Sequence, residues 1–167
     1  AKVGKWGPGA PRVRTTAANW KLPIKWEAEA KAFEAEHGRR QRVFCASLAD
    51  VFDNEVDPQW RADLFALIMA TPSLDWLLVT KRIGNVARMV QPEWLAPGGW
   101  PKNVRLMITV VNQKEADHDI PKLLAIGCPN GLSIEPMLGA VDLTELQGPG
   151  AARTWIDGLR GSASDMG

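Results

Sequence analysis

The amino-acid sequence predicts an α/β fold, either a partial (βα) barrel or an open parallel sheet with flanking helices. Four short apolar runs end in polar residues, as buried parallel strands do, and they cover residues 42–47, 76–80, 105–110 and 132–135. Helical pattern or a turn follows each run. A strand and a helix that repeat at intervals of roughly 25–30 residues indicate right-handed βαβ crossovers, and therefore a parallel sheet.

Helical signals accompany these strands in four segments, namely residues 26–37, 57–70, 84–90 and 112–124. The first segment is rich in strong helix formers and is followed by Gly38, which suits the position after a helix C-terminus. Asp57 followed by Pro58 is typical of a capped helix start. Two other prolines are expected to interrupt helices. Pro23 should limit any helix upstream of it, and Pro121 should kink or split the last helix.

The chain divides into three parts by composition. Residues 1–26 are rich in Gly, Pro, Arg and Trp and are expected to form an irregular N-terminal loop segment. Residues 27–157 carry the βα repeats, and a last strand is expected at Trp155 and Ile156. Residues 158–167 are rich in Gly and Ser and lack the apolar residues of another βα unit, so a flexible tail is expected.

The bulk composition is that of one globular domain. The chain has 167 residues, of which 46% are hydrophobic and 23% are charged, so it can bury a core and is unlike a disordered chain. Its formal net charge of +1 requires neither a nucleic-acid nor a membrane partner. No apolar run approaches the roughly 20 residues that span a bilayer, and the N-terminus lacks the apolar core of a signal peptide. We therefore expect a cytoplasmic protein.

The cysteine and tryptophan content limits the kinds of disulfide, metal and base-stacking sites that the chain can form. The two cysteines, Cys45 and Cys128, exclude a disulfide framework and cannot by themselves make a Cys-rich zinc or iron–sulfur site. Cys45 lies inside an apolar strand and is expected to be a buried, unreactive thiol. The eight tryptophans show no fixed repeat. We expect most of them to pack in the core, with base stacking as the alternative for a few.

Common signatures of nucleotide-binding and hydrolytic enzymes are missing from the sequence, namely GxGxxG after a strand, GxxxxGK[ST], HExxH and GxSxG. The candidate site is instead a set of polar residues near the strand carboxyl ends, the edge at which α/β folds bind ligands. We expect the following residues to line a cofactor and substrate pocket: Ser47, Asp50, Thr80, Lys81, Thr109, Asn112, Ser133 and Glu135.

Several of these residues also have a structural explanation. Glu135 follows an apolar strand, so a buried carboxylate there would have to bind a ligand or pair with Lys81 or Arg105. Lys81 could hold a phosphate or carboxylate, or it could cap the sheet edge. Asn112 is also explained as a helix cap. Ser47 has no histidine partner in view, so a hydrolytic nucleophile is not expected there.

Five ordered motifs carry a family resemblance. They are WGPGAPR, VFCASLADVFD, LDWLLVTKR, ITVVNQ and LSIEPMLG, which begin at residues 6, 43, 74, 108 and 132. Together they resemble a bacterial and phage family, the phage Gp37/Gp68-like family, which is related in fold to radical S-adenosylmethionine enzymes. The resemblance implies a partial (βα) barrel with its site at the strand carboxyl ends. It also implies S-adenosylmethionine and an iron–sulfur cluster as cofactors of the intact protein.

This chain departs from the family pattern at both ends. Family members carry three cysteines upstream of the WGPG motif, and this chain begins too late to contain them. Members also continue from a final strand into a Gly-Gly-Glu-Ser segment, whereas residues 155–158 lead into a different tail. We therefore expect a truncated member, with no metal ligands of its own and no cofactor assured for this chain alone.

Three functions remain as alternatives. The first is a truncated radical S-adenosylmethionine-like barrel protein that acts on a nucleic acid or a nucleotide. The second is a non-enzymatic phage accessory module that binds nucleic acid through the loop of Arg12 and Arg14 and through exposed tryptophans. The third is an inactive fragment. The sequence names neither the substrate nor the oligomeric state.

Overall fold

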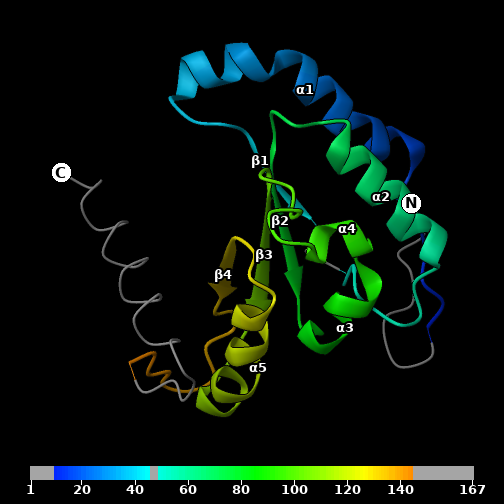
Figure 1. The fold of residues 1–167 in the computed structure, drawn as a ribbon. Coiled ribbons are helices and arrows are strands. Elements are labelled where there is room, and N and C mark those ends of the chain that lie inside the picture. Colours follow the sequence, from blue (N-terminus) through cyan, green and yellow to red (C-terminus); the bar gives the residue numbers. More distant parts are fainter. Residues whose placement is uncertain (1–9, 46–48, 145–167) are drawn as a thin grey trace.

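The computed structural model describes residues 10–45 and 49–144, which form a four-stranded parallel sheet and five α-helices (Figure 1). The strands are β1 (Arg42–Cys45), β2 (Asp75–Thr80), β3 (Val104–Thr109) and β4 (Asn130–Ser133). The helices are α1 (Ala17–His37), α2 (Pro58–Met69), α3 (Ile83–Met89), α4 (Pro92–Leu95) and α5 (Gln113–Ala125). The predicted α/β class and parallel sheet are confirmed, and the partial barrel stays a prediction. The strand expected at residues 155 and 156 and the tail lie outside the described residues.

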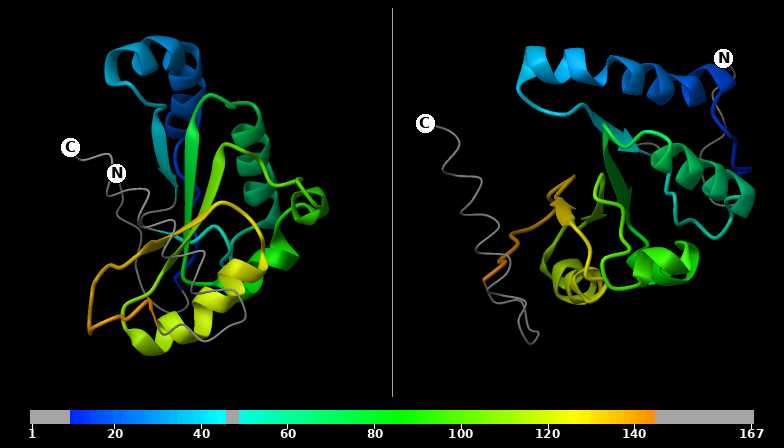
Figure 2. Two further views of the ribbon diagram at one scale, coloured as in Figure 1. Left: turned by 60° about the vertical axis from the view of Figure 1, so that its left-hand side comes forward. Right: turned by 45° about the horizontal axis from the view of Figure 1, so that its top comes forward.

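The strands lie in the order β1-β2-β3-β4, and every neighbouring pair is parallel. The connections pass through α2 between β1 and β2, through α3 and α4 between β2 and β3, and through α5 between β3 and β4. Crossovers of one hand place successive helices on the same face of a sheet when the strand order follows the sequence. The views of the ribbon in Figures 1 and 2 agree with this arrangement for α2, α3 and α5.

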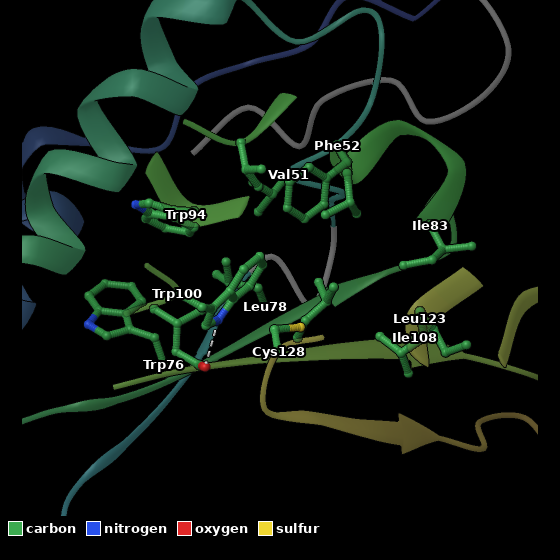
Figure 3. Packing of buried hydrophobic residues seen from close by; sticks show 14 of the residues in the cluster. Val51, Phe52, Trp76, Leu78, Ile83, Trp94, Trp100, Ile108, Leu123 and Cys128 are labelled. Carbon is green, nitrogen blue, oxygen red and sulfur yellow. Dashed lines mark hydrogen bonds between the residues drawn. The ribbon is translucent and has the colours of Figure 1, made fainter. Parts of the chain in front are cut away.

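The helix-covered face of the sheet holds the core. Trp76, Leu78, Leu106 and Ile108 alternate along β2 and β3, and each is at most 2% exposed. Their alternation follows from the two-residue period of strand side chains. They form one cluster with apolar residues of the helices and of the loop after β1 (Figure 3). The sequence of the strands therefore decides which face of the sheet the helices cover.

Three tryptophans have the packing role that the sequence predicts. Trp76, Trp94 and Trp100 are buried in the core cluster, and the ring centroids of Trp94 and Trp100 lie 5.3 Å apart in an edge-on arrangement. The indole N–H of Trp76 donates to the hydroxyl of Thr71 at 3.0 Å. That of Trp100 donates to the carbonyl of Val104, also at 3.0 Å. Both buried indoles thus have the hydrogen-bond partner that burial requires.

The opposite face of the sheet is not covered by a helix of the described chain. Phe44 on β1 is 52% exposed, and Leu77, Val79 and Met107 on β2 and β3 are half-buried. The strand register places Phe44 beside Leu77, and Val79 beside Met107. These residues make a continuous, partly exposed apolar surface, which we call the open face.

The N-terminal helix begins earlier than the sequence predicts. Thr16 caps α1, and its hydroxyl accepts the backbone N–H of Asn19 at 3.4 Å. Residues 17–26, expected in an irregular loop, are therefore helical, and the predicted boundary after residue 26 lies inside α1. The helix ends as expected at Gly38, whose φ of 66° is readily adopted by glycine.

Two prolines lie inside helices that they were expected to interrupt. Pro23 lies within α1, so the predicted limit to the helix is wrong, and Pro121 lies within α5 without splitting it. A helical proline removes the hydrogen bond to the carbonyl four residues earlier. Those carbonyls belong to Asn19 and Asp117, which are exposed residues. Water can therefore replace the missing donor at both positions.

Candidate functional site at the carboxyl edge of the sheet

The four strands end at one edge of the sheet because every neighbouring pair is parallel. Lys81 directly follows β2 and Glu135 lies just after β4, so both belong to this carboxyl edge. The geometric premise of the predicted site is therefore confirmed. The edge has two parts, which are a network of charged residues near β1 and β2 and a hollow near β3 and α5.

Asp50 ties the loop after β1 to the end of β2. Its carboxylate accepts the hydroxyl of Thr80 at 2.8 Å and the backbone N–H of Lys81 at 3.0 Å. It also accepts the N–H of Phe52, within its own loop, at 2.9 Å. Thr80 is 1% exposed, and its hydroxyl accepts the N–H of Arg82 at 2.8 Å. The polar atoms of Asp50 and Thr80 are therefore engaged by groups of the protein itself.

Asp53 pairs with two arginines beside this network. Its carboxylate lies 2.9 Å from Nε of Arg12 and 3.4 Å from Nη2 of Arg82, and it accepts the N–H of Glu55 at 3.0 Å. Burial by itself would raise the pKa of Asp53. The Glu55 hydrogen bond and the charges of Arg12 and Arg82 outweigh that effect and lower the pKa below its ordinary value. Asp53 is thus a buried, ionised carboxylate with structural partners.

A hollow of about 350 Å³ lies beside this network. We call it the carboxyl-edge hollow, and it is lined by Lys81, Thr109, Val111, Glu115, Asp119, Pro136 and Leu138. Lys81 is exposed, and its ammonium forms no ion pair with a described residue. The hydroxyl of Thr109 likewise has no hydrogen-bond partner among those residues, although the side chain is 8% exposed. Two predicted site residues thus meet here with their polar atoms available.

Helix α5 contributes two carboxylates to the carboxyl-edge hollow. Glu115 and Asp119 are four residues apart, which places them on the same side of a helix. Glu115 accepts the N–H of Val111 at 3.2 Å, and Asp119 lies 3.0 Å from Nζ of Lys122. Asn112 caps α5, because its side-chain oxygen accepts the N–H of Glu115 at 3.0 Å. The structural explanation of Asn112 is confirmed, and a ligand contact by it stays a prediction.

Ser133 and Glu135 do not line the hollow. Ser133 ends β4 opposite Thr109 in the register. Glu135 is exposed and has no ion pair with a described residue, so the burial that would demand a partner does not occur. Arg105 was one expected partner, but it lies at the amino end of β3 while Glu135 follows the carboxyl end of β4. Ser47 lies outside the described residues.

The arginines of the N-terminal segment are already paired. Nη2 of Arg12 lies 2.8 Å from Asp53 and 2.9 Å from Glu55. Arg14 pairs with Asp63 at 2.7 Å, and its guanidinium lies 4.1 Å from the ring centroid of Trp20. The positive charges that a nucleic-acid-binding loop would need here are therefore balanced within the chain.

Nothing in the described part of the chain resembles a metal site, because no three or more His, Cys, Asp or Glu side chains are grouped to hold an ion. Cys45 ends β1, and Cys128 lies just before β4. Burial raises the pKa of the Cys45 thiol to about 12 and that of Cys128 to about 11. Burial therefore disfavours the thiolate, which is the reactive form of cysteine, at both positions.

Sequence reasoning missed part of the hollow. Neither Glu115 nor Asp119 was identified as a candidate. Their spacing on a helix that starts at the carboxyl edge was the available signal. Leu138 joins the hollow through a backbone hydrogen bond from its N–H to the carbonyl of Val111 at 2.8 Å. No local sequence pattern predicts a contact of that kind.

Comparisons with known proteins give one match. A family profile described as "Protein of unknown function (DUF5131)" matches residues 2–159, a range that includes all the strands and helices described above. Neither the curated proteins nor the solved structures give a match. In the described ranges, no helix combines the length and apolarity needed to cross a membrane.

Proposed function

The chain belongs to the DUF5131 family, and from this starting point we propose that it is the core of a barrel-type enzyme that binds an anionic ligand in the carboxyl-edge hollow. One observation carries the proposal. The ammonium of Lys81 lies at the edge where four parallel strands end, and it forms no ion pair with a described residue. Ligands of α/β sheets and barrels bind at that edge. The finer class proposed is that of the sequence resemblance, a phage or bacterial radical S-adenosylmethionine-like enzyme acting on a nucleic acid or nucleotide.

The lining of the hollow suits a small polar molecule. Lys81 offers a cation for a carboxylate or a phosphate, and the hydroxyl of Thr109 can donate or accept a hydrogen bond. Glu115 and Asp119 offer carboxylate oxygens for hydroxyl or ammonium groups, and Leu138 supplies an apolar wall. The volume of about 350 Å³ lies at the lower end of the usual range for small-molecule sites.

The two cofactors implied by the resemblance fit this chain differently. S-adenosylmethionine carries a carboxylate, an ammonium and ribose hydroxyls, which match the charges of Lys81, Glu115 and Asp119. An iron–sulfur cluster does not fit the residues of this chain, because it has two cysteines and such clusters are usually held by four. We therefore derive no step through a cluster, and the proposal concerns ligand binding by the residues of this chain.

Calorimetric titration of S-adenosylmethionine into the 167-residue chain tests the proposal, with Lys81→Gln as the key variant. A charge-assisted hydrogen bond contributes about 1.5–3 kcal/mol, so the variant should weaken binding by about tenfold or more. Lys114→Gln is the matched control, because Lys114 is an exposed lysine on α5 that does not line the hollow. The control should bind like the unaltered chain.

Two outcomes would contradict the proposal. One is the absence of any binding heat with S-adenosylmethionine. The other is an affinity of Lys81→Gln equal to that of the Lys114→Gln control, which would show that the ligand binds away from the carboxyl-edge hollow.

A further inference from the structure

The amino end of the open face carries positive charge that the described chain does not neutralise. Arg42 on β1, Lys102 just before β3 and Arg105 on β3 are all exposed. No ion pair joins any of them to a carboxylate of the described residues. Arg105 instead donates from Nη1 to the carbonyl of Asn130 at 3.3 Å. We call these three side chains the amino-edge cations.

Asp75 is the acidic residue nearest to the amino-edge cations in the strand register, but it does not neutralise their charge. Asp75 lies opposite Arg42 in the strand pairing. Oδ1 of Asp75 is 3.3 Å from Nε of Arg40, so Asp75 is paired with that arginine. Arg40 also donates hydrogen bonds to the carbonyls of Ser73 and Leu74. One arginine outside the amino-edge cations thus already uses this carboxylate. The local charge remains strongly positive although the net charge of the chain is only +1.

The amino-edge cations border a hollow and an exposed aromatic ring. The hollow has a volume of about 300 Å³, and its lining includes the three cations with Leu77 and Met107. The register places Leu77 between Phe44 on one side and Arg105 on the other. Phe44 is 52% exposed and lies two residues after Arg42, so both side chains point to the same face of the sheet. Positive charge and apolar surface therefore adjoin each other.

From this juxtaposition we infer that the open face binds single-stranded nucleic acid, with phosphates at the amino-edge cations and a base against Phe44. The cations lie on β1, on β3 and in the loop before β3, and strands β1 and β3 are about 10 Å apart at the usual strand spacing. They therefore form a row that suits a chain of phosphates better than one phosphate. Grooves for single strands combine cations with aromatic rings in this way.

A single strand fits this surface better than a duplex or an acidic peptide. Phe44 can stack only with a base that is not held inside a duplex, and an acidic peptide offers no planar base. The amino-edge cations lie at the opposite end of the strands from the carboxyl-edge hollow. The inference therefore stands apart from the proposed function, and neither depends on the other.

Fluorescence anisotropy of a labelled single-stranded oligothymidylate tests the inference on the full chain. Binding should weaken with salt, with a slope of log affinity against log salt of about −2, since each of three phosphate contacts contributes about −0.7. The triple variant Arg42→Gln, Lys102→Gln and Arg105→Gln should lose most of the affinity and flatten the slope. Phe44→Ser should weaken binding by about tenfold with the slope unchanged.

A second triple variant is the matched control. Lys21→Gln, Lys31→Gln and Lys114→Gln remove the same charge from exposed lysines on α1 and α5 and should keep most of the affinity. Both triple variants should show the circular dichroism spectrum of the unaltered chain, because every substituted residue is exposed.

Several outcomes would overturn the inference. They are no binding at low salt, an equal loss in both triple variants, and displacement of the oligonucleotide by polyglutamate as effectively as by unlabelled strand. If Phe44→Ser bound the oligonucleotide as tightly as the unaltered chain, the proposed base contact would be wrong and the inference would be overturned. Failure of Lys81→Gln to alter S-adenosylmethionine binding would leave this result untouched, so the two proposals fail separately.

Discussion

The two halves of the carboxyl edge carry similar residues and use them differently. Near β1 and β2, Asp50 and Asp53 accept hydrogen bonds from Thr80, Arg12 and backbone N–H groups, and their oxygens are engaged. In the hollow beside β3 and α5, the Thr109 hydroxyl and the Lys81 ammonium are side-chain groups that no described residue engages. One half is a structural junction, and the other half has capacity for a ligand.

This difference shows why polar residues at strand ends are an ambiguous signal. Thr80 and Thr109 are both threonines that end a strand, and both are more than nine-tenths buried. Of the two hydroxyls, only that of Thr80 donates to a carboxylate of the described residues, because the loop after β1 places Asp50 beside β2. The function open to each threonine depends on a neighbour distant in sequence.

The largest loss of folding stability is expected for Asp53→Asn. The substitution leaves Arg12 and Arg82 without their shared carboxylate at a nearly buried position. We expect a loss of about 2–3 kcal/mol in the free energy of unfolding, less than for a fully buried pair because both arginines are partly exposed. Urea denaturation measures it. Glu29→Gln, which breaks the exposed pair with Lys25, is the control and should cost about 0.5 kcal/mol or less. Equal losses would mean that the junction is not structural.

Replacing each threonine by valine compares the two halves directly. Thr80→Val removes one of the hydrogen bonds to the Asp50 carboxylate and leaves the Arg82 N–H without its acceptor, so it should cost about 1–2 kcal/mol. Thr109→Val removes a hydroxyl without a partner among the described residues, so the change should stay within about 0.5 kcal/mol. Urea denaturation of both variants measures the difference. A larger loss for Thr109→Val would reverse the assignment of the two halves.

Acid should weaken the interactions of Asp53 with Arg12 and Arg82. The pKa of Asp53 is lower in the folded chain than its ordinary value of 3.8, so its ionised form stabilises the fold above that value. This contribution is lost as the pH falls through the lowered folded pKa. Urea midpoints measured between about pH 7 and about pH 3 should therefore fall less for Asp53→Asn than for the unaltered chain. Parallel curves would exclude a lowered pKa at Asp53. Other carboxylates contribute to both curves and cancel in the comparison.

The smallest effect on stability is expected for Lys81→Gln. Because its ammonium forms no ion pair with a described residue, the free energy of unfolding should change by about 0.5 kcal/mol or less. The same urea series measures it beside the threonine variants. A loss comparable to that of Thr80→Val would indicate that Lys81 belongs to the structural junction after all.

Local signals predicted the elements well where neighbours in sequence make the decisive contacts. Asp57 caps α2 through the N–H of Gln59 at 2.9 Å, and Asn112 caps α5 in the same way. Both caps join residues two or three apart, so the sequence contains both partners. The rule that proline stops a helix failed at Pro23, because solvent near Asn19 can replace one lost hydrogen bond and the helix is capped upstream at Thr16.

The site was predicted less completely than the fold. Lys81 and Thr109 were candidates and do line the carboxyl-edge hollow, whereas Asp50 and Thr80 are engaged in the junction. Glu135 was a candidate because a buried carboxylate needs a partner, but it is exposed. Whether a strand-end carboxylate is buried depends on the segments that pack over it, which the strand itself does not reveal.

The sequence alone determined the α/β class, the parallel direction of the strands and the edge at which their polar ends gather. Those features follow from hydrophobic periodicity and from connections that contain helices, both of which are local. Only the tertiary structure decided that Asp50 meets Thr80, that Lys81 has no described ion-pair partner, and that Arg42, Phe44 and Arg105 share an open face. The physical reason is that pairing and exposure depend on side chains from separate strands and loops, whose approach is set by packing rather than by sequence spacing.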